Sequence, residues 1–312
     1  MPAFFYGNLF FMTLPYLTQA RVPLTSEIDA VNEFGERQKV SIPAERALTV
    51  YVDKRELVTL MTLGANPELL VLGYLRNQRL VRDVADIESI TVDWEVGAAA
   101  VKTRHGIKDI EEKTAHRVVT TGCGQGSVFG GLMDAVDQIA LPADAAITQS
   151  QLYGLVNTIR LKETTYKSAG SVHACALFST VSGDADMLLF VEDVGRHNAI
   201  DTIAGWMWVN KAPTLATTHP ASSGLVFYTT GRLTSEMVIK SAQMGVPVVV
   251  SRSGITQMGH QVAQLVGLCA IGRATHKRFL CYTHAERLQL EPGLVAMPSA
   301  LSASSAGKKN LD

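Results

Sequence analysis

The sequence predicts an α/β protein in which a mixed, mainly parallel sheet lies between layers of helices and follows a smaller, mostly β layer. Over residues 172–283, short apolar runs that suit buried strands alternate with segments of helical periodicity. Such β-α-β-α-β order favours a sheet covered by helices on both faces. Residues 47–102 instead hold strand-like segments around a single helix.

Composition indicates a globular protein. The 312 residues are 47% hydrophobic and 18% charged, enough to bury a substantial core. The net charge of −1 gives no general attraction to nucleic acid or to a membrane, so polyanion binding would depend on local basic clusters. Four cysteines without a secretory leader predict free thiols in a reducing compartment, and we expect a cytoplasmic protein.

We expect four segments along the chain. Residues 1–40 form an N-terminal appendage, either a strand that docks a partner or an over-extended start. Pro15 cuts its apolar beginning short of the ~20 residues that a membrane span needs. Residues 41–115 form the mostly β subdomain. Residues 116–290 form the α/β domain, with a mobile cysteine loop at 121–131. Residues 291–312 are a disordered tail that is rich in Ser and Ala.

In the β subdomain, strands are predicted at 47–52 and 56–63, and strand-like alternation returns at 91–102. Between them, Asn66 and Pro67 supply a cap and a first-turn proline for a helix that ends near Arg76.

The predicted elements of the α/β domain are listed here in two sets. Helices are expected at 128–139, 149–163, 198–208, 234–244 and 256–266. Strands are expected at 172–180, 187–191, 225–230, 246–251, 268–271 and 279–283.

One cysteine stands apart from the others. Cys123 lies between Gly122 and Gly124 in a glycine-rich loop, which has no core to join. Ser127 is placed to cap the helix that follows, and a helix N-terminus favours a thiolate. We therefore expect a chemical role for Cys123. The other three thiols, which lie in apolar strand runs, are expected in the core: Cys175, Cys269 and Cys281.

Three successive strand-to-helix junctions carry glycine and arginine, and hydroxyl residues accompany them. The carboxyl ends of parallel strands share one edge of a sheet, so these groups predict a cationic rim for a ligand with several phosphates. Glu192 or Asp193 is available to accept hydrogen bonds from a base edge such as that of guanine. The basic groups are Gly195-Arg196, Gly231-Arg232, Arg252-Ser253-Gly254 and, before the last strand, Arg273, His276, Lys277 and Arg278.

Simpler explanations exist for each of these groups. An arginine at a helix start can be an ordinary solvated residue, and His197 can cap the helix without binding phosphate or transferring a proton. The sequence contains neither a P-loop nor a G-x-G-x-x-G run after a strand. The spacing of Cys269, His276, Cys281 and His284 matches no usual zinc motif, so we expect no metal site.

These motifs resemble those of the FdhD/NarQ formate dehydrogenase accessory proteins. The resemblance rests on six segments between residues 120 and 284. They are T-T-G-C-G (120–124), G-S-V-H-A-C-A-L (170–177), E-D-V-G-R-H-N-A-I-D (192–201), T-T-G-R-L-T-S-E-M-V (229–238), G-V-P-V-V-V-S-R-S (245–253) and C-Y-T-H (281–284).

The resemblance implies a sulfurtransferase with a cytidine-deaminase-like fold that works as a homodimer. Such a protein accepts sulfur from a cysteine desulfurase as a persulfide. It passes the sulfur to the molybdenum or tungsten cofactor in its bis-guanine-dinucleotide form, and formate dehydrogenase receives that cofactor. Cys123 falls on the persulfide cysteine, and Arg273 to Arg278 fall on the cofactor-binding loop.

Combining the rim with the resemblance gives the predicted cofactor-binding residues. They are Asp193, Arg196, His197, Gly231, Arg232, Ser251, Arg252, Arg273, Ala274, Thr275, His276, Lys277 and Arg278.

Two departures from the family pattern affect the prediction: the first concerns individual cofactor contacts, and the second keeps a non-catalytic carrier open. The usual aromatic-Ala-Arg of the binding loop is Arg273-Ala274-Thr275 here, and the frequent Cys-x-x-Cys reads Cys123-Gly-Gln-Gly126. One thiolate suffices to attack a persulfide, but a resolving disulfide lacks its second thiol. The alternatives are a chaperone that delivers the cofactor without persulfide chemistry and a nucleotide-binding hydrolase. The deaminase zinc signature is absent, which argues against zinc-dependent deamination.

Overall fold

The computed structural model describes residues 14–107, 136, 139–162, 165–210 and 224–294. The first sheet has the strand order β1-β6-β7-β4-β5. Its strands are β1 (Tyr16–Leu17), β4 (Arg46–Val52), β5 (Arg55–Thr62), β6 (Ile87–Asp93) and β7 (Ala98–Thr103), with helix α1 (Pro67–Asn77) and the 3-10 helix η1 (Val84–Asp86) between them. The strands expected at 47–52 and 56–63 and the helix with its first-turn proline are confirmed, but the Asn66 side chain makes no capping hydrogen bond. Residues 91–102 are not one strand, because the chain turns at Gly97, whose φ is +62°.

The second sheet has six strands in the order β10-β9-β11-β12-β13-β14. Its neighbouring strands β11, β12 and β13 are parallel, and β10 runs in the same direction because β10 and β11 both pair antiparallel with β9. This is the mixed sheet that the sequence predicts. The bounds are β9 (His173–Ser179), β10 (Asp186–Asp193), β11 (Leu225–Thr229), β12 (Val248–Ser251), β13 (Cys269–Thr275) and β14 (Arg278–Thr283).

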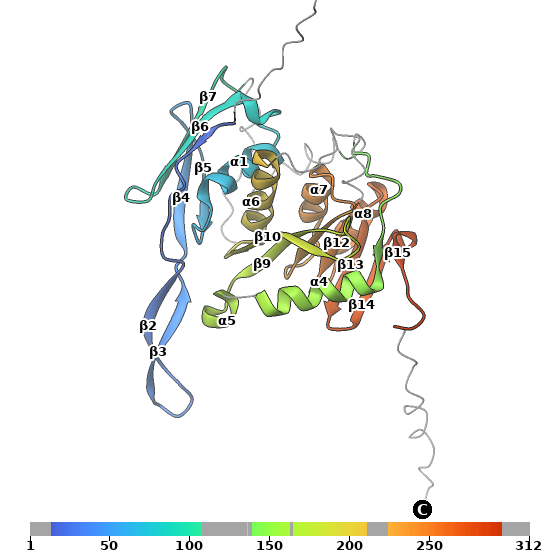
Figure 1. Ribbon diagram of the computed structural model, residues 1–312. Coiled ribbons are helices and arrows are strands. Elements are labelled where there is room, and N and C mark those ends of the chain that lie inside the picture. The colour runs from blue at the N-terminus through green and yellow to red at the C-terminus, as the bar shows by residue number, and fades with distance from the viewer. Residues whose placement is uncertain (1–13, 108–135, 137–138, 163–164, 211–223, 295–312) are drawn as a thin grey trace, which may run out of the picture.

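Helices cover both faces of this sheet (Figure 1). One face packs against α6 (Arg196–Val209), α7 (Ser235–Gln243) and α8 (Gln257–Leu265). The other packs against α4 (Gln149–Lys162), beside which lie the short helix α5 (Thr165–Ala169), the strand pair β8 (Ile147–Thr148) and β15 (Leu288–Gln289), and η4 (Ala285–Arg287). The three-layer α/β prediction is confirmed. None of the helices in the described part of the chain has the length and hydropathy that a bilayer crossing requires.

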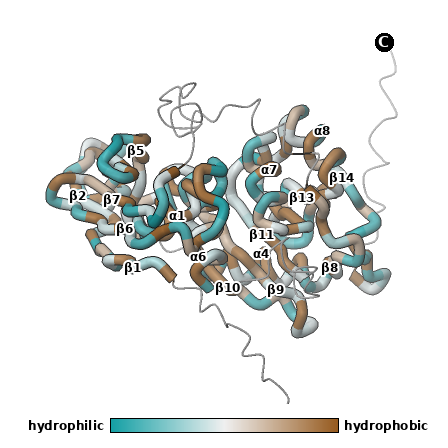
Figure 2. The backbone as a smooth tube through the Cα atoms, turned by 90° about the horizontal axis from the view of Figure 1, so that it is seen from above, coloured by the Kyte–Doolittle hydropathy of each residue, from teal (hydrophilic) through white to brown (hydrophobic). Residues whose placement is uncertain are grey.

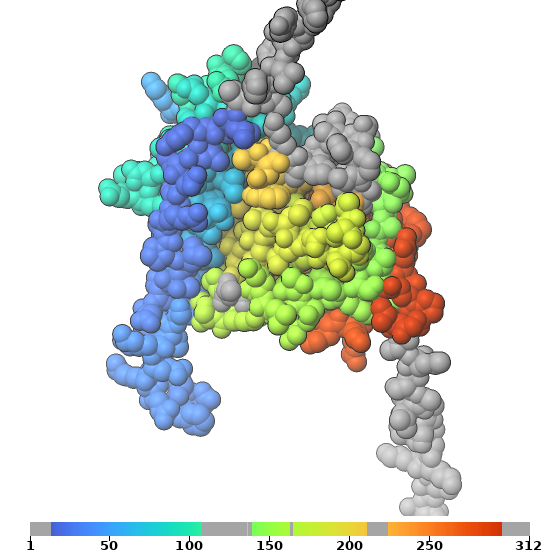
Figure 3. Space-filling model, viewed as in Figure 1, coloured from blue at the N-terminus to red at the C-terminus, as the bar shows by residue number. Residues whose placement is uncertain are grey.

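A β-hairpin projects from the body beside α5 (Figure 3). It consists of β2 (Thr25–Val31) and β3 (Arg37–Pro43), which pair with each other in a two-stranded sheet. Strand β3 therefore crosses the boundary that we expected at residue 40. Residues 14–40, expected as part of the appendage, contribute most of this hairpin and the strand β1, which pairs with β6.

Helices α1 and α6 join the two sheets. They lie side by side in both ribbon and tube views (Figures 1 and 2). Gly73 of α1 and Gly205 of α6 face the partner helix so closely that a methyl group on Gly73 would overlap the carbonyl oxygen of Asp201. A methyl group on Gly205 would likewise overlap the carbonyl oxygen of Leu69. Glycine is therefore required at both positions of the crossing.

The crossing can be tested with Gly73→Ala. The added methyl group has no space beside the backbone of α6, so the helices must separate, and we expect a loss of about 3 kcal/mol or more in the free energy of unfolding. Urea denaturation followed by circular dichroism measures the loss. The matched control is Gly154→Ala in α4, where a methyl group meets nothing within 4 Å. Because alanine favours helices over glycine, this control should be neutral or stabilising by up to about 1 kcal/mol. Equal stability of the Gly73→Ala variant and the wild type would contradict the close backbone contact between α1 and α6 at Gly73.

Candidate functional site

The predicted strand ends meet at one edge of the six-stranded sheet. Strands β10 to β13 all end there, so the junctions at Gly195, Gly231 and Gly254 share this edge with residues 273–278. The binding loop expected at 273–278 is shorter in the structure, because β13 extends to Thr275 and β14 begins at Arg278. The expected gathering of these segments is therefore confirmed. The structure then separates the predicted residues into buried groups that shape the loops and exposed groups that face solvent.

Ser251 and Gly231 belong to the buried set. The Ser251 hydroxyl donates to the Gly231 carbonyl at 2.6 Å, and its oxygen accepts from the Ser253 N–H at 3.0 Å. The Gly231 N–H donates to Thr229 Oγ1 at 3.1 Å. These bonds tie the loop after β11 to the loop after β12. A methyl group on Gly231 would lie 2.8 Å from Cδ of Arg196, so the arginine stem lies across this glycine.

Asp193 is buried and bonds to two parts of the chain. Its Oδ2 accepts from the Thr62 hydroxyl and the Leu63 N–H, at the end of β5. Its Oδ1 accepts from the Gly195 N–H at 3.0 Å and from Asn198 Nδ2 at 2.8 Å, at the start of α6. Burial raises the pKa of Asp193 to about 6, although these bonds oppose the rise. The geometry gives this carboxylate a structural role in place of contact with a base edge.

Glu192 also serves the fold. Its carboxylate accepts from the backbone N–H groups of Thr165 and Tyr166 at 2.9 and 3.1 Å, at the start of α5. Neither carboxylate of the Glu192-Asp193 pair is thus directed at the solvent side of the edge.

His197 lies in a buried polar cluster between α6 and α7. Its Nε2 is 3.2 Å from Oε2 of Glu236, and Lys240 Nζ is 3.0 Å from Asp201 and 3.4 Å from Glu236. Burial lowers the pKa of His197 to about 3, and Glu236 only partly offsets this effect. The imidazole is therefore neutral near pH 7 and supplies no charge for a phosphate.

The exposed set supplies the positive charge of the edge. Arg196 and His197 are buried, but the remaining basic residues of the prediction are exposed. The Arg252 guanidinium lies 5.5 Å from the centre of the Tyr166 ring, which orients it across the edge. The exposed members are Arg232, Arg252, Arg273, His276, Lys277 and Arg278, accompanied by Thr275.

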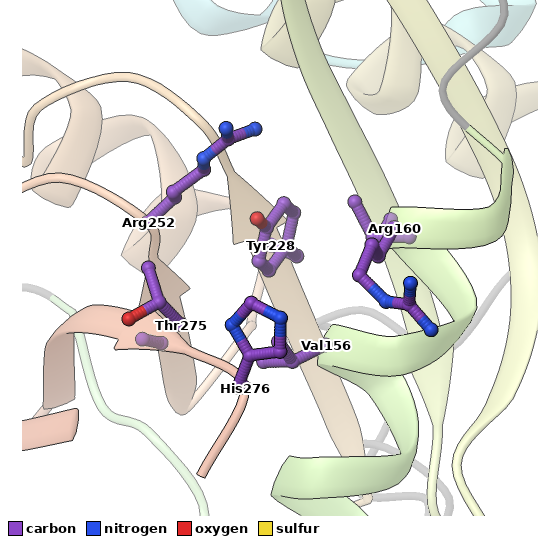
Figure 4. A pocket seen from close by; sticks show the side chains of 8 residues that line it. Val156, Arg160, Tyr228, Arg252, Thr275 and His276 are labelled. Atoms are coloured by element: carbon purple, nitrogen blue, oxygen red, sulfur yellow. The ribbon is translucent and has the colours of Figure 1, made fainter. Parts of the chain in front are cut away.

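Two adjoining pockets open between α4 and residues 274–277, with volumes of about 130 and 270 Å³. Arg252 and Arg160 flank the first pocket from opposite sides, with Tyr228 at its base and His276 in front (Figure 4). Ala274 and Thr275 complete the predicted residues that line it, and Lys277 lines the second pocket. Arg273 and Arg278 line neither of the two.

The motifs did not reveal the contribution of α4. This helix adds Tyr153, Val156, Asn157, Ile159 and Arg160 to the pockets, and β11 adds Tyr228. The Arg160 guanidinium donates to Asn157 Oδ1 at 2.9 Å, one helical turn away. The sequence predicted a helix at 149–163, but the approach of this helix to residues 273–278 depends on tertiary packing.

The pockets combine positive charge with apolar and aromatic walls. Arg160, Arg252 and Lys277 can each donate charge-assisted hydrogen bonds to phosphate oxygens. Tyrosine rings and the Val156 side chain suit a flat ring system. No group of three or more His, Cys, Asp or Glu side chains that could hold a metal ion occurs among the described residues.

The thiols differ in their surroundings. Cys123 lies outside the described residues, so its predicted role remains a prediction. Cys175 is buried on the α6 side of the sheet, where its thiol lies 3.3 Å from Thr229 Oγ1. Burial raises the pKa of Cys175 to about 12, so this thiol is unreactive. Cys269 is buried as expected, whereas Cys281 is only partly buried.

The raised pKa of Asp193 predicts a pH dependence of stability. Because the folded-state pKa is about 6 and the ordinary value is 3.8, folding takes up a proton between these values. The contribution of Asp193 is therefore fully present below pH 3.8 and is lost as the pH rises through about 6, by on the order of 3 kcal/mol.

Urea unfolding of the wild type and Asp193→Asn across this range measures the effect. The variant should be less stable, since an amide cannot accept all four hydrogen bonds, and its stability should fall less between pH 4 and 6. Asp29→Asn in the exposed hairpin is the control and should follow the wild type. Parallel pH curves for the wild type and Asp193→Asn would show that this carboxylate does not titrate as described.

Comparison with known proteins agrees with this architecture. Residues 43–289 match the FdhD/NarQ family. The sulfur carrier protein FdhD of Bacillus licheniformis is 31% identical over 254 residues, covering 81% of this chain and 92% of its own. That of Bacillus subtilis is 31% identical over 265 residues, with coverage of 82% and 94%. The crystal structure of a putative formate dehydrogenase accessory protein from Desulfotalea psychrophila shares the fold. It has a TM-score of 0.67 at 21% identity and covers 85% of this chain and all of its own. The chain belongs to the FdhD/NarQ family.

Proposed function

We propose that this protein is a sulfur carrier in the maturation of formate dehydrogenase. Cys123 accepts sulfur from a cysteine desulfurase and carries it, as a persulfide, to the molybdenum cofactor in its bis-guanine-dinucleotide form. Membership of the family, in which relatives bear the name sulfur carrier protein FdhD, supports the sulfur chemistry. The position of Cys123 within T-T-G-C-G supports the choice of residue.

The loading step balances with one thiolate. The Cys123 thiolate attacks the outer sulfur of the desulfurase persulfide and forms a new S–S bond. The original S–S bond breaks, and the desulfurase cysteine leaves as a thiolate. No second cysteine is needed for this step, which fits the Cys123-Gly-Gln-Gly126 sequence.

The pocket between Arg160 and Arg252 supports the part of the proposal that concerns cofactor binding. The cofactor is the substrate, and its guanine nucleotide arms combine a flat base with a pyrophosphate. Arg160 and Arg252 stand on opposite sides of a pocket with an aromatic base, as Figure 4 shows. We assign the pyrophosphate to these two arginines and Lys277. A homodimer remains part of the proposal because the family resemblance implies it.

A chaperone that delivers the cofactor without persulfide chemistry is the second candidate, favoured by the single thiol of the loop. Cys123→Ser separates the two functions. For a sulfur carrier, the variant should bind guanine nucleotide as the wild type does but should fail to activate formate dehydrogenase in cells that lack the native gene. Normal activation by Cys123→Ser would favour the chaperone.

Arg160→Ala and Arg252→Ala test the pocket. Each change removes charge-assisted hydrogen bonds, so the affinity for GDP should fall roughly tenfold to a hundredfold and should depend less on salt. Isothermal titration calorimetry at two salt concentrations provides the measurement. Lys102→Ala is the matched control, because Lys102 is exposed on β7 and pairs with Glu88 at 2.7 Å. Unchanged GDP affinity in both arginine variants would remove the pocket from the proposal.

A further inference from the structure

Two cysteines that the sequence places in separate strands lie close together on the last two strands of the six-stranded sheet. Cys269 begins β13, and Cys281 lies on β14, the outermost strand of the six. Their sulfur atoms are 3.8 Å apart, although 12 positions separate them in the sequence. Cys269 is fully buried, while Cys281 is partly exposed. Neither thiol belongs to the pocket or to the cysteine loop.

The two thiols are chemically unequal. A hydrogen bond from the Cys269 thiol lowers the pKa of Cys281, whereas the same bond and burial raise the pKa of Cys269. The more exposed sulfur is thus also the one with the greater thiolate character. Access and thiolate character together decide which cysteine an oxidant attacks.

We propose that Cys269 and Cys281 are a redox-active dithiol that forms a reversible intrachain disulfide, with Cys281 as the thiol that meets the oxidant. A disulfide requires a sulfur separation of about 2.05 Å, so the two sulfurs must approach by roughly 1.7 Å. The strands are already hydrogen-bonded neighbours, with Ile271 opposite Cys281. In a reducing compartment, a disulfide of this kind is transient and reports the redox state.

A hydroperoxide is the oxidant class that we assign. The Cys281 thiolate attacks the peroxide oxygen, the O–O bond breaks, and the products are Cys281 sulfenic acid and, after protonation, water or an alcohol. The Cys269 sulfur then attacks the Cys281 sulfur, the S–O bond breaks, and water leaves. Together the two thiols lose two electrons and two protons, and the peroxide gains them. A thiol reductant reverses the reaction by exchange.

The position of the pair links it to the binding loop. A bond between residues 269 and 281 closes a ring around residues 270–280, which include Thr275, His276 and Lys277 of the pockets. This hairpin is irregular, since its strand register shifts twice and Arg273 and His276 both have φ of +51°. The disulfide would join the two strands that hold this turn. The inference does not rest on the proposed function, because it requires neither Cys123 nor the cofactor.

Peptide mapping of the full-length protein tests the dithiol. The folded protein is treated with hydrogen peroxide, its remaining thiols are alkylated, and it is digested with trypsin without reductant. Cleavage after Arg252, Arg273, Arg278 and Arg287 places the two cysteines in separate peptides, 253–273 and 279–287. We expect these peptides to be joined, two hydrogens lighter than their sum, and to separate after reduction with dithiothreitol.

The variants and internal controls make the outcome decisive. Cys123→Ser should give the same linked peptides, which separates this inference from the proposed sulfur transfer. Cys281→Ser should abolish the link and protect Cys269 from oxidation. The buried Cys175 should remain reduced in the same digest, which reports that the protein stayed folded. The proposal is overturned if the peptides join only after denaturation, or if Cys281 pairs with a cysteine of another molecule instead of Cys269.

Discussion

The close approach of α1 and α6 is the constraint on which the rest of the structure depends. Two backbones can lie this near only where Gly73 and Gly205 face each other, so the pair fixes how the β subdomain sits on the α/β domain. Asp193 reinforces the same junction, because one carboxylate holds the chain after β5 and the first turn of α6 together. The N-terminal layer thereby positions the edge of the larger sheet, although it contributes none of the residues that line the two pockets.

Some polar residues of the site are buried and hold its loops in place, whereas others reach the solvent at the pockets. Asp193 and Ser251 are buried and complete hydrogen bonds within the fold, and the neutral His197 is buried beside Glu236. Arg252, His276 and Lys277 reach solvent beside Arg160 of α4, in pockets that combine positive charge with aromatic walls. This division matters because buried groups in fixed hydrogen bonds hold the loops in place, while the exposed cations can meet a phosphorylated substrate.

Much of the fold was predictable from local patterns, and much of the site was not. Apolar runs and helical periodicity located the strands and helices of residues 172–283, and strand direction then gathered their junctions at one edge. The burial of Asp193 and His197 could not be read from their motif, because it depends on Thr62 and Glu236, which are distant in the sequence. Tertiary packing also determines the position of Arg160 beside the pockets, the proximity of Cys269 to Cys281, and the close approach of Gly73 to Gly205. The hairpin at residues 25–43 has mostly exposed side chains, so it showed no clear apolar periodicity.

The most direct test of the account is mass spectrometry of the Cys123 peptide after the protein has been incubated with a cysteine desulfurase and cysteine. The account predicts one added sulfur atom on Cys123, removable by reductant and absent from Cys123→Ser. An unmodified Cys123 while the desulfurase turns over, or sulfur spread equally over all four cysteines, would contradict it.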